Sequence, residues 1–317
     1  MAVSPTPGEL EYVNNYTSES RANGSYVGRE FFSGNWMEIL SLVIALAGLV
    51  GNSTVLWLLG FRIPRNPFSV YILNLAGADA LFLCCSFLIS IDRFVDYLGY
   101  SFKYYVAVCT KYCFYVVGLS LLAAISTERC LSVLFPIWYK CHRPKHMSAA
   151  VCAVLWALPV LFWVAGAIVY VRIKHQYFLD FLFITEFMWF VLLTCVLCVS
   201  SLTLLLRVQC SFQRQHPPRL YLLVLLTVLM FLVCGLPLEI GFFIEYLSRI
   251  SMHYWFAHLM AYVNSSVNPI IYFFLGRQRH RRRESLRVIL QRALGEEQEL
   301  GGGIRDNPHT NSPETSF

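Results

Sequence analysis

Ionisable side chains are rare in the apolar parts of this sequence, and the few that occur there could bind a ligand or work a switch. They are Asp79, Lys111, Glu128, Arg129, Glu186 and Glu239, with Glu245 at the margin of its apolar run. A charge in such a run is costly unless it is paired, hydrated or used, so each one marks a place where recognition or switching is expected. Their positions define a middle, an inner and an outer group.

The middle group is a carboxylate with three amides: Asp79, Asn52, Asn264 and Asn268. These side chains can hydrogen-bond to one another as a structural cluster that joins helices. They can equally hold water or coordinate a small cation such as sodium through oxygen, and the sequence leaves both interpretations open. Pro269 follows directly and lacks a backbone donor, so a bend is expected beside the cluster.

The inner group is the dipeptide Glu128-Arg129 at the end of an apolar run. The two side chains can pair with each other or with groups on the run at 219–247, which would make a latch that a partner can break. Arginines at helix ends also extend to the membrane surface without any switching role. Gly235 and Pro237 lie in the run at 219–247 and predict a kink or hinge there.

The outer group centres on Lys111, which precedes Arg129 by 18 residues. That separation is five helical turns, so the two residues share a face and lie about 27 Å apart. We expect Lys111 to face an outer cavity, with Glu239 and Glu186 entering from other helices. Lys111 and Glu239 either frame a ligand site or only neutralise each other. The aromatic residues expected to complete the ligand site are Tyr112, Tyr115, Phe242 and Tyr262.

Helices that cross a membrane must position these groups. The chain has 317 residues, of which 57% are hydrophobic and 14% charged, whereas soluble domains average about 25% charged residues. Apolar stretches of about 20 residues predict an all-α membrane protein, a seven-transmembrane-helix bundle. The expected spans are 36–60, 68–91, 104–135, 147–171, 178–206, 219–247 and 255–276.

The placement of basic residues fixes the expected orientation. The segments between spans that would be cytoplasmic, together with the tail, hold most of the Lys and Arg, including the run RQRHRRR at 277–283. By the positive-inside rule the N-terminus is then extracellular and the basic run meets anionic lipid headgroups. This placement argues against nucleic-acid binding as the role of the net charge of +6. Asn15 and Asn23 are expected glycosylation sites in the outer segment 1–35.

Cysteine placement argues against an extracellular disulfide framework. None of the eleven cysteines lies in the N-terminal segment or around 172–177, so most are expected to be buried thiols. The transmembrane domain is expected over 36–276. It is followed by a basic amphipathic helix at 277–294, suited to lying on the inner leaflet, and a disordered tail at 295–317.

Six motifs occur in order along these spans and carry a resemblance. They are GNSTV with Asn52, LNLAGAD with Asp79, ERC with Arg129, Trp156, Pro237, and NPIIY at 268–272. The chain resembles a rhodopsin-like, class A G-protein-coupled receptor over about residues 36–294. Stretches such as RLYLLVLLTVLMFLVCGLPLEI and ILQRALGEEQEL look like the Mas-related receptors of that class.

The resemblance implies a function and its residues. The expected protein is a plasma-membrane receptor, not an enzyme, that senses an extracellular peptide or small amphipathic ligand and activates heterotrimeric G proteins. Glu128, Arg129, Pro237 and Tyr272 would carry the switch, and no cofactor other than a possible sodium ion at Asp79 is implied. Gly235 stands where many class A receptors have tryptophan, and Tyr104 replaces the usual cysteine.

The sequence bears differently on three other protein classes. A transporter would predict repeated halves and broken helices, and a metalloprotease would predict a motif such as His-Glu-x-x-His; the sequence shows neither. A non-signalling decoy receptor stays open as the alternative. In the tail, Thr310, Ser312, Thr315 and Ser316 are candidate phosphorylation sites for arrestin recruitment, and the terminal Thr-Ser-Phe is a candidate PDZ ligand.

Overall fold

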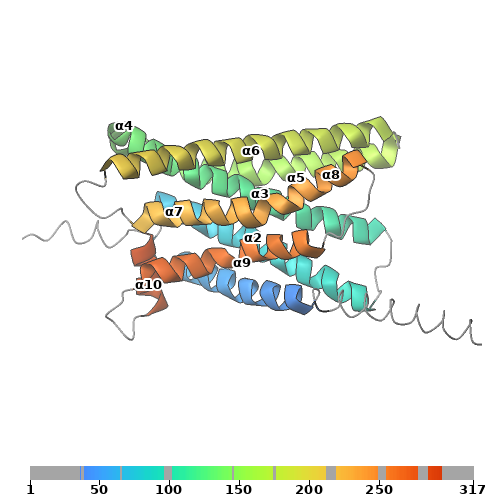
Figure 1. Cartoon of the computed structure of the whole chain (residues 1–317), viewed down its shortest axis with the longest axis horizontal. Helices are drawn as coiled ribbons and strands as arrows, with labels where there is room; N and C mark the ends of the chain where they lie inside the picture. Colours follow the sequence, from blue (N-terminus) through green and yellow to red (C-terminus); the bar gives the residue numbers. More distant parts are fainter. Residues whose placement is uncertain are drawn as a thin grey trace, which may run out of the picture.

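The structure, a computed structural model, describes residues 36, 39–64, 66–95, 102–144, 146–173, 176–211, 219–248, 255–277 and 285–294. All regular secondary structure in these ranges is helical, and seven helical runs lie side by side in a bundle (Figure 1). The first run is Ile39–Arg62, whose last five residues form the π-helix η1 (Leu58–Arg62). The others are α2 (Pro67–Val95), α3 (Phe102–Leu134), α5 (Met147–Ile173), α6 (Gln176–Ser211), the run formed by α7 (Arg219–Met230), η2 (Phe231–Gly235) and α8 (Leu236–Ser248), and α9 (Trp255–Gly276).

The length and composition of these helices suit a membrane. Five are long and apolar enough to cross one: the first run, α2, α3, α5 and α6. The sixth run has a shorter apolar core, Leu222–Leu238, and α9 carries the amides that lower its hydropathy. The seven predicted spans are therefore present, with ends that differ by a few residues.

Helix α3 lies at the centre of the bundle. It packs against α2, α5, α6 and α7, and 67% of its most apolar window is buried inside the bundle, against 17% for the window of α5. A helix that is apolar all round and still exposed, as α5 is, must meet lipid. Side chains on α3 are consequently the ones best placed to contact several helices at once.

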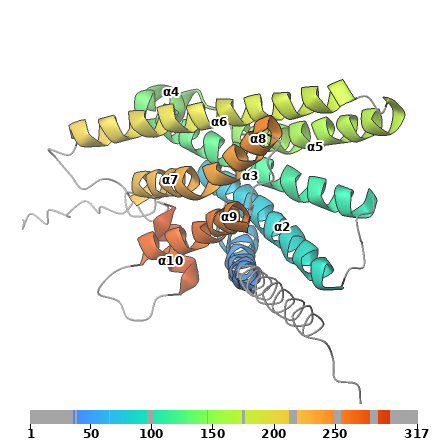
Figure 2. The same cartoon turned by 45° about the vertical axis from the view of Figure 1, so that its right-hand side comes forward.

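Helix six, the run α7–η2–α8, changes its hydrogen-bonding pattern just before Pro237. The π-helix η2 covers Phe231–Gly235, and α8 then begins at Leu236. Proline donates no backbone hydrogen bond, and a π-segment is one of the recognised causes of a helix kink. Figure 2 shows α8 turning away from the line of α7. The hinge predicted from Gly235 and Pro237 thus takes the form of a π-segment followed by a change of direction.

Polar side chains join helices that are distant in sequence. The Asn52 amide donates to the backbone oxygen of Ser265 on α9 at 3.0 Å, and the Trp156 indole of α5 donates to Asn74 of α2 at 3.1 Å. Such bonds hold transmembrane helices together where burial of apolar surface cannot, because lipid is as apolar as the helices. A Cβ on Gly48 would run into the Ser266 hydroxyl, so glycine is what allows the first helix to approach α9.

Two short helices mark one end of the bundle, here called the inner end. These are α4 (Pro136–Cys141) and α10 (Leu286–Ala293), which lies across the end of α9 (Figure 1). Ile289, Leu290 and Leu294 are buried, whereas Leu286 is exposed. The amphipathic helix was predicted to rest on lipid; in the structure most of its apolar face packs against α9 and α7. Residues 278–284 of the predicted segment lie outside the described ranges.

Candidate functional site

The structure joins two members of the middle group, Asp79 and Asn268. Asp79, Asn52, Asn264 and Asn268 are all buried, and the Asn268 amide donates to Asp79 Oδ2 at 2.8 Å. That bond joins α2 to α9 directly beside Pro269. An amide is a neutral donor, so it orients the carboxylate without neutralising it.

Two buried polar atoms here lack a protein partner among the described residues: Asn52 Oδ1 within the middle group and the hydroxyl of Tyr272, which lies near Asp79. Gly118 of α3 faces the same space, and a Cβ there would lie 3.6 Å from Asp79 Oδ1. Buried polar atoms of this kind are usually satisfied by water or an ion. The oxygen-rich donor set therefore fits a small hard cation as well as internal water.

The inner group is arranged differently from the sequence expectation. Arg143, just beyond α4, forms a buried ion pair with Glu128 and donates from Nε to Glu128 Oε1 at 2.7 Å. The Tyr139 hydroxyl donates to the same oxygen at 3.0 Å, and the Tyr71 hydroxyl lies 3.4 Å from Oε2. Burial and the nearby Glu128 carboxylate raise the pKa of Tyr139, so its phenol keeps the proton that it donates. Glu128 thereby ties α2, α3 and α4 together.

Arg129 makes a separate contact. Its guanidinium carbon lies 3.8 Å from the ring centroid of Phe68 at the start of α2, a cation–π geometry. Sequence reasoning placed Glu128 and Arg129 in one latch and did not single out Arg143. The sequence feature that could have indicated Arg143 is its position shortly after α3, since a basic residue there can fold back onto the Glu128 carboxylate.

The outer half of α3 presents two different faces. One holds Lys111, Tyr115 and Gly118, whose spacing of four and three residues follows the helix. Lys111 is buried, and the Tyr115 ring lies 5.2 Å from that of Phe82 of α2. This face therefore looks toward α2. Tyr262 of α9 joins it, with its ring 5.8 Å from that of Phe82.

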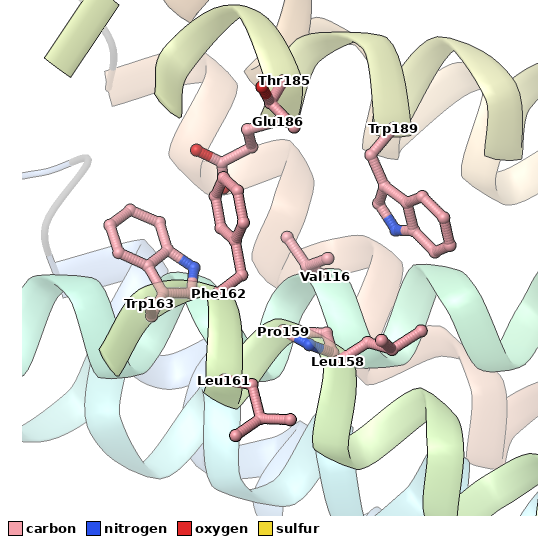
Figure 3. Close-up of a pocket in the computed structure, with 9 residues that line it drawn as sticks. All are labelled: Val116, Leu158, Pro159, Leu161, Phe162, Trp163, Thr185, Glu186 and Trp189. Atoms are coloured by element: carbon pink, nitrogen blue, oxygen red, sulfur yellow. The ribbon is translucent and has the colours of Figure 1, made fainter. Parts of the chain in front are cut away.

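The second face begins one residue later, about 100° around the helix. Tyr112 lies edge-on to Trp163 of α5, with ring centroids 6.1 Å apart. Val116 helps to line a cavity of about 430 Å³ between α5 and α6 (Figure 3). Glu186 of α6 lines this cavity, and Lys111 does not. The prediction that Lys111 and Glu186 share one ligand site stays a prediction.

A hydrogen bond connects the first of these faces to helix six. The Tyr115 hydroxyl donates to the backbone oxygen of Gly235 at 3.0 Å. Gly235 is the last residue of η2, and a Cβ there would meet the Phe231 ring at 2.5 Å. The position where many class A receptors have tryptophan is therefore filled by Phe231, while Tyr115 reaches the backbone of the π-segment. Sequence reasoning named Tyr115 as a ligand contact and missed this bond.

Several predicted residues cannot be placed. The side chains of Glu239 and Phe242 lie outside the described part of the chain, as do Asn15, Asn23 and the tail. The predicted contact between Lys111 and Glu239 therefore stays a prediction. Glu186 lines the cavity between α5 and α6, and Tyr112 contacts Trp163 of its wall. Tyr115 and Tyr262 lie on the α2 side.

These features define a seven-transmembrane receptor. Seven helices surround a buried carboxylate–amide cluster, and Glu128 and Arg129 lie at the inner end of the third. The family described as "7 transmembrane receptor (rhodopsin family)" matches residues 51–272. The chain is 46% identical to the Mas-related G-protein coupled receptor member X1 of Mus musculus, over 81% of this chain and 84% of that one.

Two further relatives agree with this assignment. The chain is 44% identical to member X1 of Homo sapiens, over 84% and 86% of the two chains, and 44% identical to member E of Mus musculus, over 84% and 89%. The chain therefore belongs to the Mas-related G-protein-coupled receptors of the rhodopsin family. It is a multi-pass membrane receptor and not an enzyme, as the sequence predicted.

Proposed function

We propose that this receptor resides in the plasma membrane with its N-terminus outside, senses an extracellular peptide or small amphipathic ligand, and drives nucleotide exchange on a heterotrimeric G protein at the inner end. The observation that carries the proposal is the bond from the Tyr115 hydroxyl to the Gly235 carbonyl. It joins the aromatic outer half of α3 to the segment where helix six changes direction. A ligand that moves Tyr115 therefore acts directly on the hinge.

The switch follows from that arrangement. Ligand and G protein each stabilise the conformer in which the inner end of helix six has moved outward, so each raises the affinity for the other. Glu128, Arg129, Pro237 and Tyr272 are the switch residues of the proposal. Resemblance to the family favours G proteins that activate phospholipase C or inhibit adenylyl cyclase.

A sodium ion is part of the proposal for the middle group. Asp79 would supply the carboxylate, and the neighbouring amide and hydroxyl oxygens would complete the shell. The observation in favour is the set of buried oxygens that lack a protein partner, Asn52 Oδ1 and the Tyr272 hydroxyl. When bound, the ion would neutralise Asp79 and favour the conformer that holds it.

The partners beyond the G protein come from the tail. We assign candidate phosphorylation sites for arrestin to Thr310, Ser312, Thr315 and Ser316, and a PDZ ligand to the last three residues. The basic run at 277–283 would add contacts with anionic lipid. The support for these roles is the sequence alone.

The test is a panel of peptides and small metabolites applied to cells that express the receptor, with calcium, cyclic AMP and G-protein dissociation as readouts. Wild type should respond through at least one class of G protein. Arg129→Ala should reach the surface and bind ligand but lose G-protein turnover. Unchanged turnover in Arg129→Ala would contradict the switch, and ligand binding without a response from any G-protein class would identify the decoy alternative.

A further inference from the structure

The start of α2 holds an aromatic ring in a fixed position at the inner end of the bundle. The Asn66 side chain accepts from the backbone N–H of Ser69 at 2.6 Å, and the Ser69 hydroxyl accepts from the backbone N–H of Asn66 at 2.8 Å. This reciprocal arrangement has the form of a capping box, which fixes the first turn of a helix. Pro67 and Phe68 lie between the two capping residues, and Phe68 is only 2% exposed. The Phe68 ring therefore has little freedom to turn.

Arg129 of α3 lies on that ring. Its guanidinium carbon is 3.8 Å from the ring centroid of Phe68, well inside the distance of about 6 Å within which a ring face attracts a cation. Phe68 is buried, whereas Arg129 is only partly buried. The ring is thus the fixed member of the contact, and the arginine side chain is the member that can move.

The neighbouring charges make the ring important for holding Arg129. The N-terminus of a helix carries a partial positive charge, so the first turn of α2 repels a guanidinium. The Glu128 carboxylate already accepts bonds from Arg143 and Tyr139, and its charge is met by the buried ion pair with Arg143. The negative face of the Phe68 ring offsets the repulsion at this point.

The contact belongs to the conformer in which helix six is closed. In the structure α7 packs against α3, α9 and α10, so the inner end of helix six occupies its place in the bundle. Arg129 is then directed toward α2. A G protein that enters the space vacated by helix six would reach Arg129 only after the guanidinium leaves Phe68. The contact with Phe68 and the contact with the G protein therefore exclude each other.

We propose, on the basis of the proposed G-protein switch, that Phe68 is a positioning residue that holds Arg129 in the resting conformer and thereby limits activation in the absence of ligand. The restraint on the switch is then an aromatic ring on α2. A weaker attraction between ring and guanidinium destabilises the resting conformer alone, so the population of the open conformer rises.

Graded fluorination of the Phe68 ring tests the attraction with little change in the size of the side chain. Phenylalanines with one, two and three ring fluorines are introduced at an amber codon, and the full-length receptor is purified into lipid nanodiscs. Fluorine withdraws electrons from the ring face and so weakens its attraction for a cation. Ligand-independent nucleotide exchange on purified G protein should rise with each fluorine, to about fivefold with three.

The matched control is the same three-fluorine residue at Phe114 of α3, whose ring packs edge-on against Trp156 with centroids 6.1 Å apart. Exchange in this control should equal that of wild type. Phe68→Leu keeps an apolar side chain and removes the ring, and it should raise exchange at least as much as three fluorines do. A rise in Phe68→Leu with no dependence on fluorination would identify a contact of packing alone and overturn the proposal. An equal rise from fluorination of Phe114 overturns it as well.

Thermal unfolding separates failure of the contact from failure of the proposed function. In wild type the unfolding midpoint should fall with each fluorine at Phe68, and in Arg129→Gln the midpoint should not depend on fluorination. Midpoints that ignore fluorination in wild type, or that fall equally in both backgrounds, overturn the contact. Absence of exchange above empty nanodiscs in wild type and in every variant contradicts the proposed function, while the midpoints still decide whether Phe68 holds Arg129.

Discussion

Substituting Gly235 by alanine tests the packing of the hinge. A Cβ at this position would lie 2.5 Å and 2.9 Å from two carbons of the Phe231 ring. The closer distance is roughly 0.9 Å short of the 3.4 Å at which ordinary contact begins. Phe231 is 0% exposed, so its ring has no open space into which it can turn.

The cost follows from overpacking. Forcing an extra carbon into a filled core typically destabilises by about 1–3 kcal/mol, and alanine returns about 0.5–1 kcal/mol through its better helix propensity. Gly235→Ala should therefore be destabilised by up to about 2.5 kcal/mol. Displacement of the Phe231 ring should also weaken the bond from Tyr115 to the Gly235 carbonyl.

The assay is thermal unfolding of purified receptor, followed with a thiol-reactive dye that reports the exposure of buried cysteines such as Cys234. Gly60→Ala is the matched control: Gly60 also lies in a π-helix, and a Cβ there would meet nothing within 4 Å. Gly60→Ala should unfold at or above the wild-type temperature, and Gly235→Ala several degrees below it. Phe231→Leu should make Gly235→Ala less costly. Equal midpoints for the two alanine variants, or strict additivity of Phe231→Leu and Gly235→Ala, would refute the close contact.

The remaining predictions use the same unfolding assay. Arg143→Ala leaves the Glu128 carboxylate buried without its cation and should cost about 3–5 kcal/mol of stability. The control is Arg62→Ala: Arg62 lies on the exposed ring of Trp57, so the midpoint should change little. Similar losses of stability in the two variants would contradict the buried pair. Sodium chloride should raise the unfolding midpoint above that in choline chloride, and Asp79→Asn should abolish the difference; a sodium effect that survives in Asp79→Asn would exclude this site. A reducing agent should leave the midpoint unchanged because the described cysteines are thiols, and a marked drop would reveal a disulfide. Here unfolding is followed by tryptophan fluorescence, because a reductant would react with the thiol-reactive dye.

Composition and hydropathy predicted the fold well, because a chain with so few charges can satisfy its backbone in lipid only as helices. The predicted span 255–276 coincides with α9, and the first span, 36–60, is shifted by a few residues from Ile39–Arg62. The ends differ because lipid does not fix where a helix stops. Capping and tertiary contacts decide that, and single-sequence patterns carry little information about them.

The sites were predicted less evenly. The contact between Asp79 and Asn268 could be predicted because both residues interrupt apolar runs at similar depth in the membrane. The ion pair of Glu128 with Arg143 could not be predicted, because it depends on how the segment after α3 folds back. The neighbours of Lys111 and Tyr112 could not be predicted either, because the 100° step between these two residues on α3 gives no information until the flanking helices are known.

The docking of α10 on α9 has a consequence for how the receptor responds at its inner surface. Arg292 donates to the Gly276 carbonyl at 3.2 Å, and a Cβ on Gly276 would collide with the backbone of Ile289. The backbones of the two helices thus approach closely at Gly276, and the Arg292 side chain joins them. A tilt of α9 that begins near Pro269 should therefore carry α10 with it. The tilt of a membrane-crossing helix would then become a movement of α10 in the plane of the membrane.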